Sequence, residues 1–333
     1  METDNRIGVV LLNLGGPDSL QAVRPFLYNL FSDREIIRLG PAFLQKPIAK
    51  LISTLRSGKT RHMYSLIGGK SPILDITSSQ ARALEKALNQ GAGGKGQGAS
   101  FKVYIGMRYW RPFVKDTLDQ IIHDGIKHLI VLSLYPHYSK ATTGSAIADF
   151  KKAVAELRMP NDNFQIQYID RWYDFPGYID SLTELVSEGS REFDGKDFDL
   201  LYSAHSLPQS FIDEGDPYLE HINATISAVN SLLVARHSFP LKWHLSFQSK
   251  TGPVKWLEPS TGETILRLAE GGCKNLLVVP VSFVSDHIET LYEIDILYKK
   301  LASEHGIYLA RCRSLNTYDK FILAMKQLVM DKM

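Results

Sequence analysis

The sequence contains only two cysteines, Cys273 and Cys312, among its 333 residues. Two cysteines that stand alone in a chain cannot form a four-thiolate iron–sulfur cluster or a framework of disulfides. Proteins of this kind are typical of a reducing compartment, so the cytoplasm is the expected location.

Long apolar runs and an excess of one charge are also absent. No run reaches the roughly 20 residues that a membrane-spanning helix needs, and the acidic, polar start does not resemble a secretory or transit peptide. Lys and Arg number 38 and Asp and Glu number 36, which gives a net charge of +2. This balance disfavours nucleic acid as the main partner and predicts an ordinary globular protein.

Short apolar, β-branched runs alternate with longer amphipathic stretches along the chain. Such nearly continuous hydrophobicity indicates strands that are buried on both faces, as in a parallel sheet covered by helices. Helical periodicity marks residues 77–89 and 315–333. The predicted strands are 7–14, 101–107, 128–135, 164–169, 199–204, 241–247 and 275–283.

Length and a weak internal echo predict two lobes rather than one. A chain of 333 residues is long for a single core. Residues 125–132 resemble 272–279, and residues 10–14 resemble 200–204. We therefore predict an α/β protein of two similar lobes, each a parallel sheet flanked by helices, with a cleft between them. The lobes are assigned to 1–145, completed by a C-terminal helix at 306–333, and to 146–305.

Two of the predicted strands end near histidines. The strand at 199–204 leads into His205, and the strand at 275–283 leads into His287 and Glu289. Ligands in open α/β sheets bind outside the carboxyl ends of strands. Histidine titrates near neutral pH and binds divalent iron or zinc, so facing strand ends would form a proton-transfer or metal site. We expect an imidazole from one lobe to meet a carboxyl group from the other; a hydrogen-bonded structural histidine is the alternative for His205.

The acidic residues around the second histidine have two interpretations. Asp286 and Glu289 match the capping box of a helix N-terminus, which is a purely structural arrangement. Glu293 follows Glu289 by about one turn, so three carboxylates would share one face of a helix and repel one another. This stripe favours a site in which a cation or protons neutralise the charge.

Aromatic side chains gather at the same strand ends. Trp256 lies in a polar loop, which suggests a wall for an apolar ligand. Arg108, just after the strand at 101–107, is suited to pair with a carboxylate of that ligand. The ordinary alternative is that these aromatics fill the core. The aromatic candidates are Tyr109, Tyr135, Trp256 and Phe283.

Two glycine-rich segments do not support a nucleotide site. Gly91, Gly93 and Gly96 match the spacing of the dinucleotide motif, but a predicted helix precedes them and a strand follows, the reverse of the required order. Pro17 removes a backbone N–H that a phosphate cradle would use, so the turn at 15–17 is expected to bring backbone close to a flat ligand. A nicotinamide oxidoreductase is disfavoured for these reasons.

Residues 26–52 combine many apolar side chains with Arg34, Arg38, Lys46 and Lys50. This composition fits a lip that rests on a membrane surface. It fits helices that pack on the sheet equally well, and the sequence alone does not separate the two interpretations.

Short motifs follow one another in a definite order across nearly the whole chain. They are Asn13-Leu14-Gly15-Gly16-Pro17, Ile67-Gly68-Gly69 with Ser71-Pro72, Arg108-Tyr109, Tyr135-Pro136-His137-Tyr138-Ser139 with Thr142-Thr143-Gly144-Ser145, Ser203-Ala204-His205-Ser206-Leu207-Pro208, Gln248-Ser249-Lys250, Trp256-Leu257, and Phe283-Val284-Ser285-Asp286-His287-Ile288-Glu289-Thr290. No single motif is decisive. The ordered set resembles the ferrochelatases, enzymes that insert ferrous iron into a porphyrin to complete heme.

The resemblance implies a fold of two Rossmann-like lobes and assigns roles residue by residue. It makes His205 and Glu289 the catalytic pair, which faces the porphyrin centre and takes part in iron binding and proton removal. Glu293 would extend a relay for protons or iron. The expected substrate is protoporphyrin IX, with two protons released. The substrate-binding predictions are Leu14, Arg108, Tyr109, Tyr135, Trp256, Phe283, Asp286, His287 and Glu293.

Three positions depart from the family pattern. Leu14 stands where many relatives carry methionine or tyrosine, Ser65-Leu66 replace arginines that some members carry, and Leu297 interrupts an acidic stripe that often continues. None of these changes removes the central pair, so activity is still expected. Porphyrin preference and propionate recognition are the properties they affect.

Two other functions fit parts of the pattern. A non-catalytic carrier of tetrapyrroles or metals would need the aromatic pocket but no base, and a cobalt chelatase on the same scaffold is the closer enzymatic alternative. The predicted partners are porphyrin and ferrous iron, with iron as substrate. The resemblance implies no tightly bound cofactor and no iron–sulfur cluster. Peripheral contact with a membrane through residues 26–52 is an additional prediction.

Overall fold

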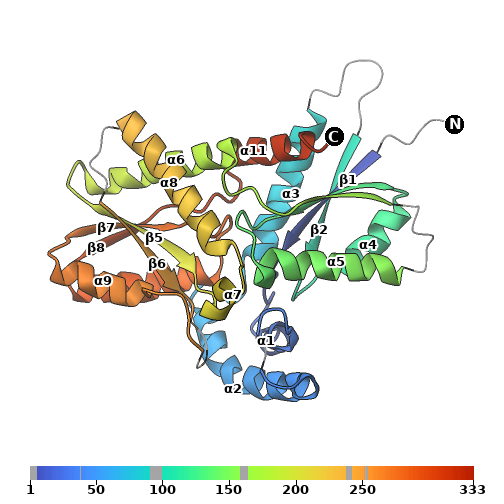
Figure 1. The fold of residues 1–333 in the computed structure, drawn as a ribbon, viewed down its shortest axis with the longest axis horizontal. Coiled ribbons are helices and arrows are strands. Elements are labelled where there is room, and N and C mark those ends of the chain that lie inside the picture. Colours follow the sequence, from blue (N-terminus) through green and yellow to red (C-terminus); the bar gives the residue numbers. More distant parts are fainter. Residues whose placement is uncertain are drawn as a thin grey trace. The chain divides into compact units, whose positions relative to one another are not determined.

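The computed structural model describes residues 6–37, 39–90, 100–157, 164–237, 242–250, 252 and 254–333. The chain divides into two compact units (Figure 1). The first unit contains residues 1–171 and 317–333, and the second contains residues 172–316. The glycine motif at residues 91–96 lies outside the described residues.

A four-stranded parallel sheet forms the centre of the first unit, with strand order β2-β1-β3-β4. Val9, Val10, Leu11 and Leu12 of the central strand β1 have no exposed surface, as expected for a strand that is covered on both faces. The strands are β1 (Arg6–Asn13), β2 (Ser100–Met107), β3 (His128–Ser133) and β4 (Gln165–Ile169).

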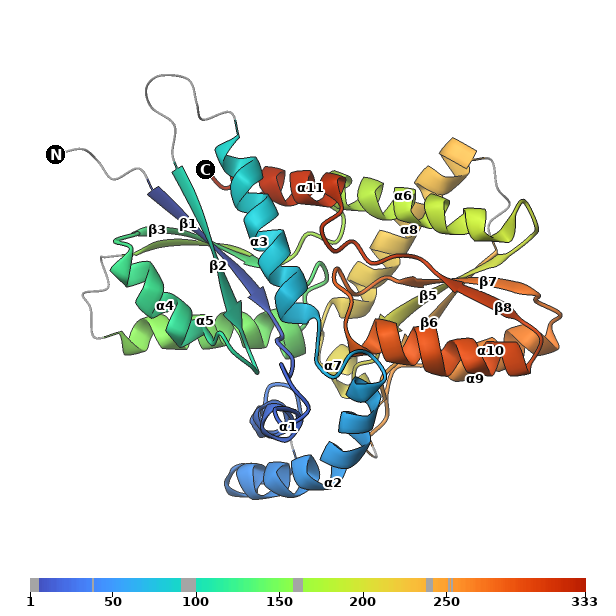
Figure 2. The same cartoon turned by 180° about the vertical axis from the view of Figure 1, so that it is seen from behind.

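Helices cover both faces of this first sheet. In Figure 2, α4 and α5 lie on one face, and α3 and α11 lie on the other. Contacts between α11 and α3 attach the C-terminal segment to the first unit. The helical elements are α1 (Val23–Ser32), η1 (Ala42–Leu44), α2 (Gln45–Ser65), α3 (Ile73–Asn89), α4 (Val114–His123), the π-helical turn η2 (Lys140–Gly144), α5 (Ser145–Glu156) and α11 (Asp319–Met330).

The second unit repeats this architecture with strand order β6-β5-β7-β8, again all parallel. Its strands are β5 (Asp199–His205), β6 (Trp243–Gln248), β7 (Asn275–Pro280) and β8 (Tyr308–Arg311). Its helical elements are α6 (Pro176–Ser190), η4 (Arg191–Phe193), α7 (Gln209–Asp213), α8 (Tyr218–His237), α9 (Thr261–Glu270), the π-helix η5 (Glu289–Tyr298) and α10 (Lys299–Glu304).

The fold confirms the prediction of two similar parallel α/β lobes, and the sequence echo matches equivalent strands. In each unit the first strand pairs with the second on one side and the third on the other. Residues 10–14 and 200–204 fall on the first strands, β1 and β5. Residues 125–132 and 272–279 lead into the third strands, β3 and β7.

The boundary between the units differs from the predicted one. The first unit continues to Arg171, because β4 pairs with β3 and α5 packs against the same sheet. The chain returns to the first unit at Thr317 rather than at 306, because β8 pairs with β7 in the second sheet. The short strand β8 was not predicted, since its sequence YLAR has too few apolar residues for a buried run.

Residues 26–52 are buried in one part and exposed in another. Phe26, Leu27 and Phe31 of α1 are buried. In contrast, Phe43 is 78% exposed and Leu51 is 60% exposed. Among the described helices, none combines the length and the apolar character needed to cross a membrane.

The turn after β1 is packed too closely to accept a side chain at Gly16. A Cβ atom there would lie 2.6 Å from Cβ of Ser71, whose N–H donates to the Pro17 carbonyl. We predict that Gly16→Ala lowers the free energy of unfolding by about 1–3 kcal/mol, the usual cost of overpacking. Urea unfolding of the purified protein measures this.

Gly58→Ala is the matched control for that substitution. Gly58 lies in α2, where a Cβ atom would meet open space, and alanine is a better helix former than glycine by about 1 kcal/mol. The control should therefore be neutral or stabilising. Equal stability of the two variants would contradict the close packing of this turn.

Candidate active site

His205 and Glu289 meet because two neighbouring parallel strands end side by side. His205 is the last residue of β5, and β7, which pairs with β5, leads through a turn into η5 and Glu289. Nδ1 of His205 lies 2.8 Å from Oε2 of Glu289. Both residues belong to the second unit, so the expectation that the two groups come from different lobes is wrong.

The backbone of His205 is held on both sides. Its N–H donates to Oγ of Ser282 at 2.9 Å, and its carbonyl accepts from the hydroxyl of Tyr218 at 2.9 Å. The side chain is 35% exposed, and Nε2 has no hydrogen-bond partner among the residues that the structure describes. With the backbone fixed and Nδ1 bound to Glu289, Nε2 is the ring nitrogen that is left available to a ligand or a proton.

The His205–Glu289 contact shifts both pKa values so as to favour the charged pair. Burial opposes a charge on His205, but the carboxylate of Glu289 outweighs burial and raises the pKa of His205. Burial likewise opposes charge on Glu289, yet His205 lowers the pKa of Glu289 well below its usual value. Both shifts therefore stabilise a protonated imidazole next to an ionised carboxyl group.

Glu293 has the opposite electrostatic behaviour. Burial and then the nearby Glu289 carboxylate raise the pKa of Glu293 to about 7. Its Oε2 accepts from Oγ of Ser249 at 2.7 Å and from Nε2 of Gln248 at 3.3 Å. Two adjacent carboxyl groups thus differ widely in proton affinity, an arrangement typical of acid–base sites. The charge of Glu289 thus adds to the effect of burial on Glu293.

The segment that carries both acids is π-helical from Glu289 to Tyr298. π-Helical turns are rare in proteins, and those that occur lie frequently at functional sites. Gln248, at the end of β6, donates from Nε2 to the Glu289 carbonyl at 2.9 Å. Ser249 next to it has a φ of 67°, a costly conformation for a residue other than glycine. Side chains at the end of a third strand therefore hold this segment in place.

The capping-box interpretation of Asp286 and Glu289 is wrong. A capping box requires the Glu289 side chain to accept from the Asp286 N–H. That N–H instead donates to Oδ1 of Asn316 at 2.9 Å, while Glu289 binds His205. The Asp286 carboxylate binds Arg311 and Asn316, whereas that of Glu289 binds His205 and that of Glu293 binds Ser249, so the three acids do not point to one common partner.

His287 and Phe283 pack beside the pair. Nδ1 of His287 donates to the Ser285 carbonyl at 2.9 Å, and its Nε2 lies 4.0 Å from Oε1 of Glu289. Burial lowers the pKa of His287, so this ring is neutral. The Phe283 ring lies 4.3 Å from the His287 ring and 6.4 Å from the His205 ring, measured between centroids. These two residues surround the catalytic pair with neutral groups.

Trp256 lines a separate cavity of about 390 Å³ in the second unit. Phe247 and Leu245 of β6 contribute to the same cavity. Nε1 of Trp256 is buried and has no hydrogen-bond partner among the described residues. Neither His205 nor Glu289 lines this cavity, so the structure does not bring Trp256 into direct contact with the pair.

Arg108 and Tyr109 belong to the first unit, where they surround a buried carboxylate. Oδ2 of Asp33 accepts from Nη2 of Arg108 at 2.8 Å, from the Tyr109 hydroxyl at 2.5 Å and from Oγ of Ser145 at 2.7 Å. Burial opposes the charge of Asp33, but these partners outweigh it and lower its pKa. Arg108 also pairs with Asp149 at 3.3 Å.

Leu14 and Tyr135 follow the carboxyl ends of β1 and β3, which are neighbours in the first sheet. The Leu14 carbonyl accepts from the Tyr109 N–H at 2.9 Å. These residues therefore gather at the edge of the first sheet where ligands of α/β proteins bind.

Several residues that hold the pair had no role assigned from the sequence. Ser282 and Tyr218 fix His205, and Gln248 and Ser249 hold Glu293. The available signal was the motif Gln248-Ser249, because it follows β6, the strand next to β5. No pattern in the sequence marks Ser282 or Tyr218 for such a role.

Two solved structures share the fold. The structure of SirB from Bacillus subtilis with Fe³⁺ aligns with a TM-score of 0.54 at 9% identity, over 98% of this chain and 95% of that one. The sirohydrochlorin chelatase SirB from Bacillus subtilis subspecies spizizenii in complex with cobalt gives 0.50 at 10% identity, over 98% and 94%. At such identity the likeness concerns the fold alone, which is that of the two-sheet α/β chelatases.

Similarity in sequence identifies the family. Residues 6–333 match the ferrochelatase family. Ferrochelatase from Geotalea uraniireducens strain Rf4 is 52% identical over 97% of both chains, and that from Desulfotalea psychrophila strain LSv54 is 49% identical over 97% of this chain and 96% of that one. Ferrochelatase from Synechocystis is 47% identical over 98% and 83%. The chain belongs to the ferrochelatase family, whose reaction inserts iron into a porphyrin during heme synthesis.

The electrostatic coupling of the pair can be tested by titrating His205. In Glu289→Gln the attraction that raises the pKa of His205 is removed while its burial remains. We predict that the pKa of His205 falls, because Glu293 alone is then left to oppose the effect of burial. Nuclear magnetic resonance of the labelled imidazole measures this. Asp199→Asn, which changes the partner of His244 at the other end of β5, is the control and should leave His205 unchanged.

Proposed function

We propose that this protein inserts ferrous iron into protoporphyrin IX and releases two protons, with His205 and Glu289 as the catalytic pair. The hydrogen bond between their side chains, next to a second carboxyl group with a raised pKa, is the observation that supports this assignment. A non-catalytic carrier of tetrapyrroles or metals would have no need for this acid–base arrangement. Membership of the ferrochelatase family does not favour a cobalt chelatase.

His205 accepts a pyrrole proton at Nε2. Glu289 accepts the hydrogen bond from Nδ1, so it fixes the tautomer in which Nε2 carries the lone pair. When Nε2 takes a proton, the adjacent carboxylate stabilises the resulting imidazolium. A positioned acid–base group of this kind typically contributes about 10²- to 10⁴-fold to a rate.

Glu293 is the next proton acceptor. Once Nε2 has taken a pyrrole proton, it must release that proton before His205 can act again, and the pKa of Glu293 is raised to about 7. We propose that Glu293 takes up the proton that leaves Nε2, so that His205 returns to the tautomer in which Nδ1 alone carries a proton and stays bonded to Glu289. Ferrous iron would bind to His205 and Glu289 on its way to the porphyrin, at a different moment from proton transfer, because one nitrogen cannot hold both.

The substrate-binding predictions divide into two groups. We propose that Leu14, Tyr135, Trp256 and Phe283 contact the macrocycle, and that binding of its apolar surface supports the bending that exposes a nitrogen lone pair. For Arg108 and Tyr109 we propose an indirect role. The charge of Arg108 is already matched by two carboxylates, and Tyr109 is 2% exposed. His287 and Asp286 would support Glu289.

Iron is the substrate in this proposal, and the protein carries no iron–sulfur cluster and no other tightly bound cofactor. Only two cysteines are present in the sequence, and such a cluster is ordinarily held by four thiolates. A cytoplasmic location follows from the same scarcity of cysteine.

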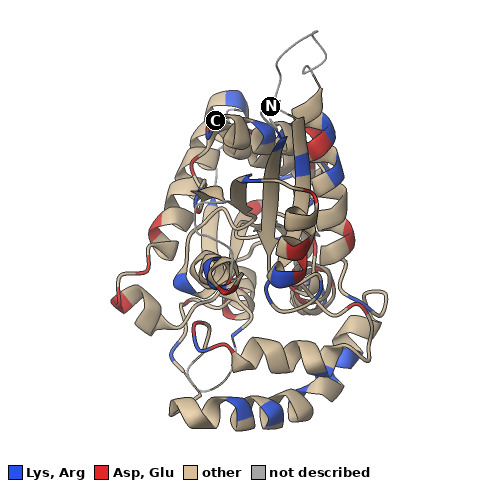
Figure 3. Ribbon diagram, turned by 90° about the vertical axis from the view of Figure 1, so that its right-hand side faces the viewer, with Lys and Arg blue, Asp and Glu red and all other residues tan. Residues whose placement is uncertain are grey.

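We further propose that α2 and the residues before it rest on an anionic membrane surface. Residues 39–74 contain no Asp or Glu but include Lys46, Lys50, Arg56, Lys59, Arg61 and Lys70 (Figure 3). Phe43, Leu51 and Leu55 of the same segment are 78%, 60% and 73% exposed. Exposed apolar side chains among basic ones are typical of helices that lie in the membrane interface. Each Lys or Arg near such a surface contributes about 1 kcal/mol.

Iron insertion by Glu289→Gln tests the catalytic assignment. With porphyrin and ferrous iron under anaerobic conditions, we predict that kcat falls by at least about 100-fold, because glutamine cannot stabilise an imidazolium. The absorbance change of metallation measures the rate. Asp199→Asn, which alters a similar histidine–carboxylate pair in the same unit, should keep the wild-type rate. A near-normal rate in Glu289→Gln would show that this carboxylate is only structural.

Vesicle binding tests the membrane proposal. We expect the protein to co-sediment with vesicles of phosphatidylglycerol and phosphatidylcholine but not with pure phosphatidylcholine, and the Leu51→Glu, Leu55→Glu double variant to lose binding. Leu323→Glu is the control, because Leu323 is 58% exposed on α11, outside the basic segment. An equal loss of vesicle binding in the double variant and in the control, or equal binding to charged and uncharged vesicles, would contradict the proposal.

A further inference from the structure

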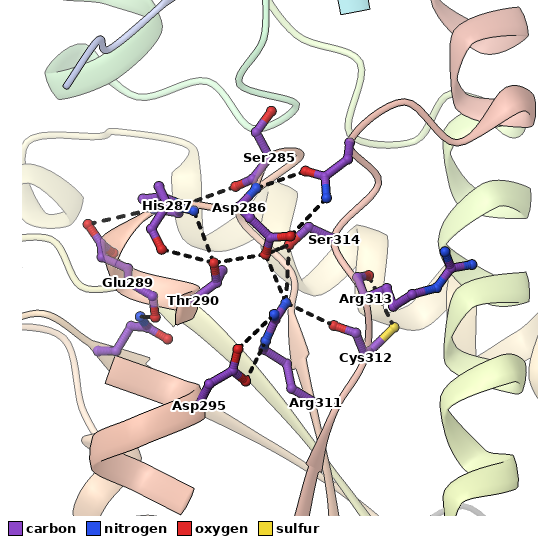
Figure 4. A network of polar contacts seen from close by, with 12 residues as sticks. Ser285, Asp286, His287, Glu289, Thr290, Asp295, Arg311, Cys312, Arg313 and Ser314 are labelled. Carbon is purple, nitrogen blue, oxygen red and sulfur yellow. Dashed lines mark hydrogen bonds and ion pairs between the residues drawn. The ribbon is translucent and has the colours of Figure 1, made fainter. Parts of the chain in front are cut away.

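Arg311, the last residue of β8, binds two carboxylates at once (Figure 4). Its Nε and Nη2 donate to the two oxygens of Asp295 at 2.8 Å each, and its Nη1 donates to Oδ1 of Asp286 at 2.9 Å. The side chain is 12% exposed. A paired, largely buried guanidinium with this fork geometry holds both partners in fixed directions.

The two carboxylates bracket the part of η5 that carries the catalytic acids. Asp286 precedes Glu289 by three residues, and Asp295 follows Glu293 by two. Residues two positions apart lie on roughly opposite sides of a helix. Arg311 therefore holds the side of η5 that faces away from Glu293, while Ser249 contacts Glu293 itself.

Asp286 is anchored by more than Arg311. Its Oδ1 also accepts from Oγ of Ser314 at 2.7 Å and from Oγ1 of Thr290 at 2.9 Å. Its Oδ2 accepts from Nδ2 of Asn316 at 2.8 Å, and the Asp286 N–H donates back to Oδ1 of Asn316. Burial opposes the charge of Asp286, but Arg311 and these hydrogen bonds outweigh it and lower its pKa. The segment 311–316 thus forms a fixed support for the start of η5.

Such a support matters because the π-helical conformation of η5 is unfavourable by itself. π-Helical turns are rare in isolation, and Glu289 and Glu293 repel each other at a spacing of four residues. A buried ion pair often adds little stability, and its best-documented use is to select one arrangement among alternatives. Here the alternatives are different windings of the segment, which would move both acids relative to His205.

We propose that Arg311 is a positioning residue that fixes the winding of η5, so that Glu289 reaches His205 and Glu293 reaches Ser249. It acts through the helix, since no hydrogen bond or ion pair joins it to Glu289 or Glu293 among the described residues. The inference rests on the proposed proton-transfer roles of the two acids, and it adds a residue that touches neither substrate nor iron.

The test compares Arg311→Lys and Arg311→Met with Arg313→Met in the full chain. Arg313 lies two residues on, is 68% exposed and pairs with Glu188, so its variant should behave as wild type. In Arg311→Met we expect kcat for iron insertion to fall about 100-fold, the typical effect of misplacing a catalytic group by about 1 Å, with an unchanged KM for porphyrin. Arg311→Lys should recover part of this loss, because lysine keeps the charge but not the two-pronged geometry.

Amide hydrogen exchange supplies the second measurement and does not depend on activity. Residues 289–298 should lose protection in the Arg311 variants while the strands β5 and β7 keep theirs. If Arg311→Met does not fold, Asp295→Asn replaces it, because Asp295 is 35% exposed and its substitution also removes the contact at the back of η5. Failure of the wild-type protein to insert iron would overturn the proposed function, but the exchange measurement would still test Arg311. Unchanged kcat, or uniform loss of protection in both sheets, would overturn the positioning role.

Discussion

The hydrogen bond between His205 and Glu289 is the interaction on which the rest of the site depends. A partly exposed imidazole and a largely buried carboxyl group stabilise each other's charge only at close range and in a fixed direction. The fold meets this demand by ending two paired parallel strands beside each other. Ser282 and Tyr218 hold one partner through its backbone, and the π-helix presents the other.

The ionisable side chains in and around this pair differ in their pKa values. Glu289 stays ionised because His205 faces it, and Glu293 holds a proton more readily because Glu289 is already charged. His287 remains neutral because it is buried beside Phe283. Glutamate and histidine side chains would titrate at their ordinary pKa values in water, so the positions of these residues rather than their identities create the differences in proton affinity that the proposed proton transfer uses.

Much of this could be predicted from the sequence, and the failures have physical causes. Apolar runs revealed seven of the strands, most plainly the central ones such as β1 and β5, where burial on both faces leaves no alternation to misread. The strand β8 escaped notice because it is short and partly polar. His205 and Glu289 were identified, yet they were expected from different lobes, although both lie within 146–305, the second predicted lobe, and the structure places both in the second unit. Arg311 and Asn316 carried no signal, since their importance lies in contacts that only the folded chain creates.

The proposed catalytic pair lies entirely within the second unit of the chain. Residues 172–316 form one continuous insertion between the two segments of the first unit, and they contain His205, Glu289, Glu293 and the side chains that hold them. The described contacts that hold these groups are therefore made within one stretch of the chain, so the alignment of the proposed proton-transfer groups is set inside the second unit alone.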